Sequence, residues 1–294
     1  IDWSPAPARG LSPDRRGQPH TAPKGASASS GAVEEFAFDP ARIEAHFQPQ
    51  LCCHTGAVTG FEMLARLRDP HRGLRRPAEF LPGLSPDQSQ ALTRAMLVQG
   101  LAALRHWDRA GHAVATVALN VAGGDLTGPY FADSVLWELD RQDIPPARLV
   151  IEVMEELSPL EAPRLVDENL RRLRAAGCRI DLDDFGTGHA SLDAIRRLGV
   201  HRVKIDRSFV TGCDRDADQQ RTILAVLALA EHLRLETLAE GVETAGEHAF
   251  AAQIGCSHVQ GYAVAAPMPL TETDGFLAQC RAQAAELPLL RRRA

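Results

Sequence analysis

From about residue 36 onward, short apolar runs alternate with amphipathic stretches. Eight of the runs have the length and composition of β-strands: 47–51, 58–64, 115–120, 148–153, 178–184, 201–206, 236–240 and 258–262. Between them, a stretch such as 218–235 places its large apolar residues on one helical stripe with charges opposite, which is typical of a helix that covers a sheet. The alternation predicts an α/β fold with a parallel sheet, and eight strands suit a closed (β/α)8 barrel.

Composition divides the chain into three parts. Residues 1–35 contain five prolines and the run GASASSG, so we expect a flexible linker from a longer multidomain protein. Residues 36–285 form the predicted barrel, and residues 286–294 form a basic tail. Because the sequence begins with Ile1 rather than Met, we expect a fragment whose missing N-terminal segments could anchor the full-length protein to a membrane.

Net charge, cysteine pattern and the length of the apolar runs limit the partners and the cellular compartment that we expect for this chain. A net charge of -6 argues against a surface built for long nucleic acid. The six cysteines form no C-x-x-C pair and lie in or beside apolar runs, which indicates reduced thiols in a cytoplasmic protein. No apolar run approaches the roughly 18 to 20 residues of a membrane span, so we expect no membrane contact within this fragment.

Nearly every predicted strand ends on an ionisable or amide residue, which a buried strand does not ordinarily carry. These residues are Glu62, Asn120, Glu152, Asp183 with Asp184, Lys204, Glu240 and Gln260. In a (β/α)8 barrel the carboxyl ends of the strands surround one mouth, so the side chains are expected to converge on a single site. One such acid alone would more often be a structural capping or ion-pair residue, but the whole set predicts a functional site.

Four carboxylates in one ring require a counter-charge. Each close pair repels by about 4 kcal/mol at an effective dielectric constant near 20. All the proposed ligands are hard oxygen donors without Cys or His, which suits Mg²⁺ or Mn²⁺ and disfavours zinc. The adjacent Asp183 and Asp184 indicate two ions, and two ions about 3.5 to 4 Å apart can activate a water for in-line displacement at phosphorus. The predicted chemistry is phosphodiester hydrolysis.

Lys204 stands out because Lys and Arg together number 32, and only Lys24 and Lys204 are lysine. A compact ammonium can enter a crowded ring of carboxylates and hold a water at the ions, whereas a planar guanidinium needs a wider, bidentate partner. Glu240 is placed to be a metal ligand or the base that receives the proton of the water. Arg66, four residues beyond Glu62, can reach over the mouth and grip a phosphate.

Eight ordered stretches over about residues 40–272 resemble the EAL family of bacterial cyclic di-GMP phosphodiesterases: FQPQL, GFEMLAR, ALNV, IEVMEE, IDLDDFGTGHASL, VKIDRSFV, LAEGVET and VQGY. The resemblance implies a modified TIM (β/α)8 barrel with one antiparallel strand, and hydrolysis of cyclic di-GMP to linear 5′-pGpG with Mg²⁺ or Mn²⁺. The metal ligands implied are Glu62, Asn120, Glu152, Asp183, Asp184 and Glu240, with Lys204, Glu240, Asp184 and Glu62 in catalysis and Gln48, Leu64, Arg66 and Gln260 against the substrate.

The resemblance also implies a mobile loop beside the metals. Gly186, Thr187 and Gly188 match that loop, and Glu155 matches the carboxylate that pins it. A homodimer and an upstream regulatory or GGDEF-type domain are further implications. Met63 stands where the family has Ala, and because it alternates away from the neighbouring acid on its strand, we expect it to pack against the outer helices.

Two other functions stay open at this point. The first is a receptor that binds cyclic di-GMP without hydrolysing it and passes the signal to a neighbouring domain. Degenerate receptors usually lose metal ligands, and this sequence retains the full set. The second is a barrel metallohydrolase acting on another phosphodiester, which fits the strand-end chemistry equally well and yields only to the family resemblance.

Overall fold

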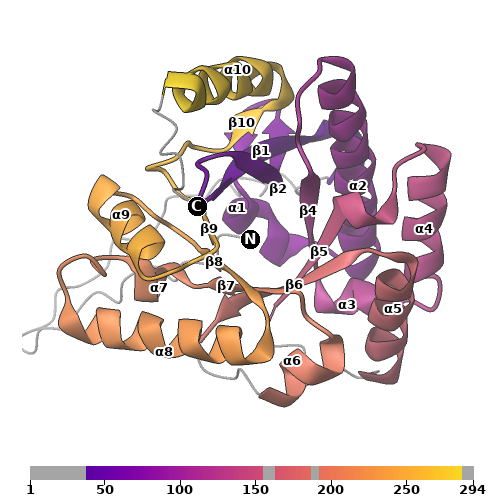
Figure 1. Ribbon diagram of the computed structural model, residues 1–294. Coiled ribbons are helices and arrows are strands. Elements are labelled where there is room, and N and C mark those ends of the chain that lie inside the picture. Colours follow the sequence, from indigo (N-terminus) through magenta and orange to yellow (C-terminus); the bar gives the residue numbers. More distant parts are fainter. Residues whose placement is uncertain (1–37, 155–162, 187–191, 287–294) are drawn as a thin grey trace, which may run out of the picture.

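Residues 38–154, 163–186 and 192–286 are described by a computed structural model (Figure 1). Within them, eight strands close into a barrel in the ring order β1–β2–β4–β5–β6–β7–β8–β9, with β9 returning to β1. Their bounds are β1 Ile43–Cys52, β2 Val58–Asp69, β4 Thr116–Val121, β5 Leu149–Met154, β6 Arg179–Phe185, β7 Arg202–Ile205, β8 Glu236–Ala239 and β9 His258–Val259. Each matches a predicted strand, so the barrel prediction is confirmed.

Strand β1 is antiparallel to both of its neighbours in the ring, β2 and β9. The other neighbouring pairs are parallel, so the expected single antiparallel strand is confirmed. Two short strands lie outside the ring and were not predicted: β3 (Gly73–Arg75) pairs with β2, and β10 (Met268–Pro269) pairs with β1.

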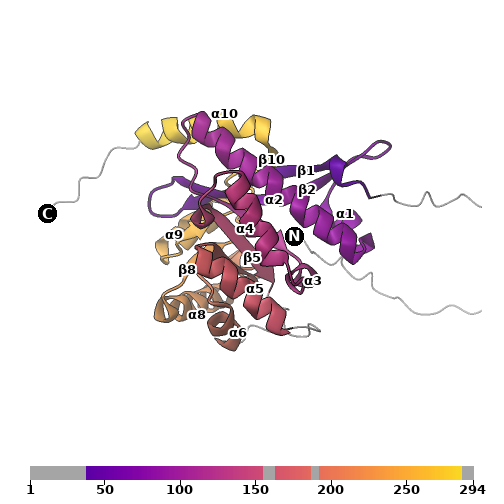
Figure 2. The same ribbon diagram turned by 90° about the vertical axis from the view of Figure 1, so that its right-hand side faces the viewer.

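Helices surround the barrel on its outside, and α2, α4 and α5 lie side by side along one flank (Figure 2). The longer helices are α2 Pro86–Arg109, α4 Phe131–Arg141, α5 Pro163–Ala176, α6 Leu192–Leu198, α8 Ala217–Leu233, α9 Ala245–Gln253 and α10 Leu270–Glu286. Single turns form α1 Pro77–Phe80, α3 Gly123–Leu126, α7 Arg207–Val210 and the 3₁₀ turns Pro40–Arg42, Leu81–Gly83 and Pro146–Arg148. Among the described helices, none combines the length and apolar content needed to cross a bilayer.

The apolar core lies between the outer face of the barrel and the helices. Phe61 on β2 stacks on Trp107 of α2 with ring centroids 4.8 Å apart, and Phe47 on β1 meets the same indole edge-on at 5.3 Å. The indole Nε1 donates to Thr273 Oγ1 of α10 at 2.8 Å. Because side chains alternate along a strand, anchoring Phe61 outward turns its neighbour Glu62 into the barrel.

Met63 also faces outward, as expected, and is buried against α2. A Cβ added at Gly100 of α2 would lie 2.0 Å from Met63 Sδ, so the helix can pass the thioether only because residue 100 has no side chain. The methionine in the EML motif therefore depends on a glycine 37 positions further along the chain.

We expect Met63→Ala to lower the free energy of unfolding by about 2 to 5 kcal/mol, because it leaves a cavity. Gly100→Ala alone should also destabilise the protein, since its methyl group collides with Met63. In the Met63→Ala background, the same Gly100→Ala should instead stabilise, because the methyl enters the cavity and Ala favours a helix by about 1 kcal/mol over Gly. Urea unfolding of the four proteins measures this coupling, and additive effects would contradict it.

Candidate metal centre

Lys204 of β7 is completely buried, and its ammonium lies in the middle of a ring of carboxylates. Its Nζ is 2.8 Å from Glu240 Oε1, 3.1 Å from Asp183 Oδ1, 3.2 Å from Glu152 Oε2 and 3.6 Å from Glu62 Oε2. The acids come from β2, β5, β6 and the position directly after β8. The closed sheet thus brings together residues that are far apart in the sequence, as predicted. Those of β5, β6, β7 and β8 lie at or next to the carboxyl ends of their strands, whereas β2 continues to Asp69, seven residues beyond Glu62.

The ring carries more negative charge than one ammonium can balance. Burial disfavours the charged form of Lys204, but the surrounding carboxylates raise its pKa well above the ordinary value. For Glu152 and Glu240, burial and the neighbouring acids raise the pKa well above the usual range. Groups with raised pKa values take up protons to relieve the excess charge, and a bound cation relieves the same excess by displacing those protons.

Glu62 behaves differently from these acids because it has donors on both oxygens. Asn120 Nδ2 donates to Glu62 Oε1 at 2.8 Å, and Gln260 Nε2 donates to Glu62 Oε2. Burial alone would raise the pKa of Glu62, but Lys204 and the two amides lower it below its ordinary value. The donors around Glu62 therefore favour its ionised form.

Asp183 and Asp184 both reach the site because β6 is irregular at this point. In a regular strand, adjacent side chains point to opposite faces. Here the register with β7 shifts between Leu182 and Phe185, and Asp184 has a φ of 54°, a left-handed conformation that Asp adopts more readily than most residues. As a result, carboxylate oxygens of Asp183, Asp184 and Glu240 lie within 4.8 Å of one another. Three such oxygens fit a single Mg²⁺ or Mn²⁺ ion.

Comparison with known families bears directly on this carboxylate ring. A family model described as the EAL domain matches residues 35–267. The chain belongs to the EAL domain family. The chain is 32% identical over 236 residues to the bifunctional diguanylate cyclase/cyclic di-GMP phosphodiesterase MucR of Pseudomonas aeruginosa. It is 33% identical over 232 residues to the cyclic di-GMP phosphodiesterase RocR of the same organism.

These alignments cover 79% of this chain but only 34% of MucR and 59% of RocR. Among solved structures, a MucR phosphodiesterase in complex with c-di-GMP has a TM-score of 0.72 at 32% identity, covering 79% of this chain and 94% of that one. The EAL domain of DcpA from Mycobacterium smegmatis has a TM-score of 0.68 at 27% identity, covering 81% and 98% of the two chains. The barrel described above is thus the fold of the EAL family.

The residues predicted to contact substrate in this EAL domain lie at two different heights along the barrel, one inside it and one at its rim. Gln48 and Gln260 are buried inside the barrel, where Gln260 Nε2 donates to Gln48 Oε1 at 3.1 Å. Arg66 and Leu64 lie on the same face of β2 as Glu62, further toward the mouth. At about 3.3 Å per residue, Arg66 is about 13 Å along the strand from Glu62, and so stands at the rim.

Part of the predicted loop is described and part is not. Gly186, directly after β6, has a φ of 103°, and a Cβ there would lie 2.7 Å from the ring of Phe209. The backbone conformation and this close approach both require glycine. Glu155, Thr187 and Gly188 lie outside the described residues, so the roles expected of them stay predictions.

A buried charged pair one level below the ring was missed by the sequence interpretation. Asp181 of β6 and Arg202 of β7 are almost fully buried, and Arg202 Nε donates to Asp181 Oδ2 at 2.6 Å. The signal was available, because each residue stands two positions before a predicted site residue, Asp183 or Lys204, and so on the same face of its strand.

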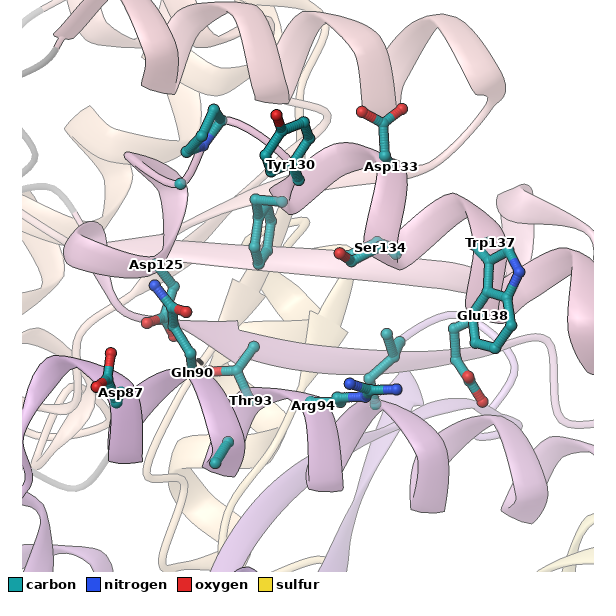
Figure 3. A pocket seen from close by; sticks show the side chains of 16 residues that line it. Asp87, Gln90, Thr93, Arg94, Asp125, Tyr130, Asp133, Ser134, Trp137 and Glu138 are labelled. Carbon is teal, nitrogen blue, oxygen red and sulfur yellow. Dashed lines mark hydrogen bonds between the residues drawn. The ribbon is translucent and has the colours of Figure 1, made fainter.

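A separate hollow of about 740 Å³ lies between α2 and α4 (Figure 3). Its lining includes Arg94, Tyr130 and Trp137, and none of its lining residues belongs to the carboxylate ring. One of its two buried acids, Asp125, accepts a hydrogen bond from Thr93 Oγ1 at 2.5 Å and so ties α3 to α2. This acid has a structural role, and the hollow is distinct from the candidate metal centre.

Proposed function

We propose that the chain is a metal-dependent phosphodiesterase that hydrolyses cyclic di-GMP to linear 5′-pGpG. The observation that carries the proposal is the buried Lys204 among the carboxylates of Glu62, Glu152, Asp183 and Glu240. The chain is a member of a family whose relatives MucR and RocR are named as cyclic di-GMP phosphodiesterases. In the reaction, water adds to phosphorus, one P–O3′ bond breaks, and the 3′ oxygen leaves with a proton.

The ligand set has the chemistry that two Mg²⁺ or Mn²⁺ ions require. It consists of Asp183, Asp184, Glu240, Glu62, Glu152 and Asn120. When bound, the ions would acidify a water and offset the negative charge that develops on the phosphate oxygens.

The residues around the ions position the reactants and move the proton. Lys204 holds the carboxylates in place from the middle of the ring and has an ammonium that can donate to the attacking water. The raised pKa of Glu240, caused by burial and by Asp183, makes this carboxylate a stronger base for the proton of the water. At the rim, Arg66 has the forked donors that fit a phosphate.

We further propose that this domain works as a homodimer and within a longer protein. The proposal of further domains is supported by its relatives, since MucR and RocR extend well beyond the aligned region and MucR is named for a second activity. Gel filtration with light scattering tests the dimer, which a single monomeric peak across concentrations would refute.

Turnover with defined metals tests the activity. The purified chain, freed of metal and then given Mn²⁺ or Mg²⁺, should convert cyclic di-GMP into linear 5′-pGpG, resolved by chromatography. Parallel assays with pGpG and a nitrophenyl phosphodiester separate this function from that of a general phosphodiesterase. Tight binding of cyclic di-GMP with no product under either metal would favour the receptor, and preference for the generic diester would favour the other hydrolase.

We expect metal affinity to fall as the pH is lowered through about 6. Burial, followed by the neighbouring Asp183 and Asp206, raises the pKa of Asp184 to about 6. Below that pH the carboxyl is protonated, and a metal ion must displace the proton, so the apparent Mn²⁺ affinity should be about tenfold lower one pH unit below the pKa. Calorimetric titrations at pH 5 and pH 7.5 measure the change. Asp184→Asn should bind Mn²⁺ more weakly and show a smaller pH effect, and an equal pH effect in both proteins would contradict the assignment.

A further inference from the structure

Beneath the carboxylate ring, the inside of the barrel carries a second layer that is polar on one side. At this level Val150 and Leu238, two positions before Glu152 and Glu240, are apolar and buried, as is usual for the filling of a barrel. The ion pair of Arg202 and Asp181 occupies the same level on the adjoining strands β6 and β7. Charges this deeply buried are costly unless their hydrogen bonds are satisfied, so the partners of the pair matter.

A continuous chain of side-chain hydrogen bonds leads from this ion pair to the candidate metal ligand Glu62. Arg202 Nη2 donates to Gln50 Oε1 at 2.9 Å. Gln50 Nε2 donates to Gln260 Oε1 at 3.0 Å, and Gln260 Nε2 donates to Glu62 Oε2. Gln50 is 1% exposed and Gln260 4% exposed, so water does not compete for these bonds.

The direction of this chain is fixed at both ends. A guanidinium has only donors, so Gln50 must turn its Oε1 to Arg202 and its Nε2 toward Gln260. Gln260 must then turn its Oε1 to Gln50 and its Nε2 toward Glu62. The carboxylate of Glu62 accepts at the far end. If the Gln260 amide were reversed, a carbonyl oxygen would face the carboxylate and repel it.

We propose that Gln50, oriented by Arg202 and Asp181, is a positioning residue for the metal centre. It acts by holding the Gln260 amide with its nitrogen toward Glu62. Glu62 then keeps one fixed orientation between Asn120 and Gln260. This inference rests on the proposed function, because it concerns how a ligand of the proposed ions is held.

Two substitutions at Gln50 test the proposal in different ways. One removes the hydrogen bond that orients the Gln260 amide, and the other favours the reversed orientation of that amide. Gln50→Met keeps the length of the side chain and removes both hydrogen bonds. Gln50→Glu keeps the acceptor for Arg202 but presents an oxygen to Gln260 Oε1. The carboxylates at positions 50 and 62 then compete for the one Gln260 amide nitrogen, which also donates to Gln48 Oε1. We expect both variants to bind Mn²⁺ about 10- to 100-fold more weakly in calorimetry, as is typical for partners behind a metal ligand, with the larger loss for Gln50→Glu. The kcat for cyclic di-GMP should fall while the KM stays near that of the wild type.

A double-mutant cycle distinguishes action through Gln260 from a general effect on the core. In a Gln260→Met background, Gln50→Met should cause no further loss of Mn²⁺ affinity. Gln142→Met is the matched control, since Gln142 is also buried and bonded to a carboxylate, Glu138 Oε1 at 2.6 Å, but lies on the outside of the barrel. This control should bind Mn²⁺ as the wild type does.

Thermal unfolding of each variant shows whether it is folded. If Gln50→Met does not fold, Gln50→Glu, which retains the bond to Arg202, provides the same test. A folded Gln50 variant with wild-type Mn²⁺ affinity would overturn the positioning role alone, as would an undiminished loss in the Gln260→Met background. A wild-type protein that neither binds Mn²⁺ nor hydrolyses cyclic di-GMP would overturn the proposed function and the positioning role together.

Discussion

Replacing Lys204 by arginine should lower the kcat for cyclic di-GMP by about 10²-fold or more, the loss that a misplacement of about 1 Å produces at a reacting centre. The positive charge is kept, but the shape is not. Lys204 Nζ contacts four carboxylates at distances from 2.8 to 3.6 Å, and the side chain is fully buried. A guanidinium is planar and larger than an ammonium, so it cannot meet all four acids without moving some of them.

Steady-state kinetics with Mn²⁺, together with a thermal unfolding curve, measure the effect of Lys204→Arg on turnover and on folding separately. The sequence offers a matched control, because Lys24 is its other lysine and lies outside the described residues. Lys24→Arg should leave the kcat unchanged. A Lys204→Arg protein that turns over at the wild-type rate would refute the view that this site requires an ammonium.

Glu62→Ala should reduce turnover by about 10³-fold or more, comparable to removing a main electrostatic contributor from an active site. Two causes add here. The substitution removes a carboxylate that Lys204 and two amides keep ionised, and it leaves the Asn120 and Gln260 amides without their acceptor. Mn²⁺ affinity should fall in parallel, which calorimetry detects independently of turnover.

Glu44→Ala serves as the control for this second prediction. Glu44 lies on β1 and forms an exposed ion pair with Arg68 on β2, so it belongs to the same hairpin as Glu62 but not to the ring. Exposed ion pairs contribute little to stability, so Glu44→Ala should fold normally. Because Glu44 is not part of the ring, neither turnover nor Mn²⁺ affinity should change in this variant. Near-normal turnover by Glu62→Ala would remove this residue from the proposed ligand set.

The strands of the barrel could be predicted because each is a short apolar run bounded by polar residues. The start of β1 was missed, since Glu44 and His46 do not look like strand residues, yet β1 begins at Ile43. These residues are strand because β2 pairs with them along nearly their whole length, which is a tertiary effect. The two-residue β10 was missed for a similar reason, because Met268 and Pro269 become a strand only by lying beside β1.

The sequence indicated which residues meet at the candidate site, but not the backbone geometry that brings them together. Strict alternation would send Asp183 and Asp184 to opposite faces, and only the register shift in β6 explains how both reach the mouth. The interior layer formed by Asp181, Arg202 and Gln50 depends on contacts between β1, β6 and β7. This layer lies two residues before the strand-end residues, so it could not be found from the strand ends alone, although the two-residue spacing within each strand indicates which residues face the same way.

The antiparallel strand β1 also determines when the barrel can close during synthesis of the chain. Strand β1 needs β9 and β10 as partners, and these lie on the order of 200 residues downstream. At roughly 5 to 20 residues per second, translation needs about 10 to 40 seconds to reach them. Until then one edge of the β1–β2 hairpin has no partner, and Gln260 has not yet been synthesised. A chain that is held on the ribosome before this point therefore has an unpaired strand edge, and release of the last barrel segment closes the ring and supplies the Gln260 amide that holds Glu62.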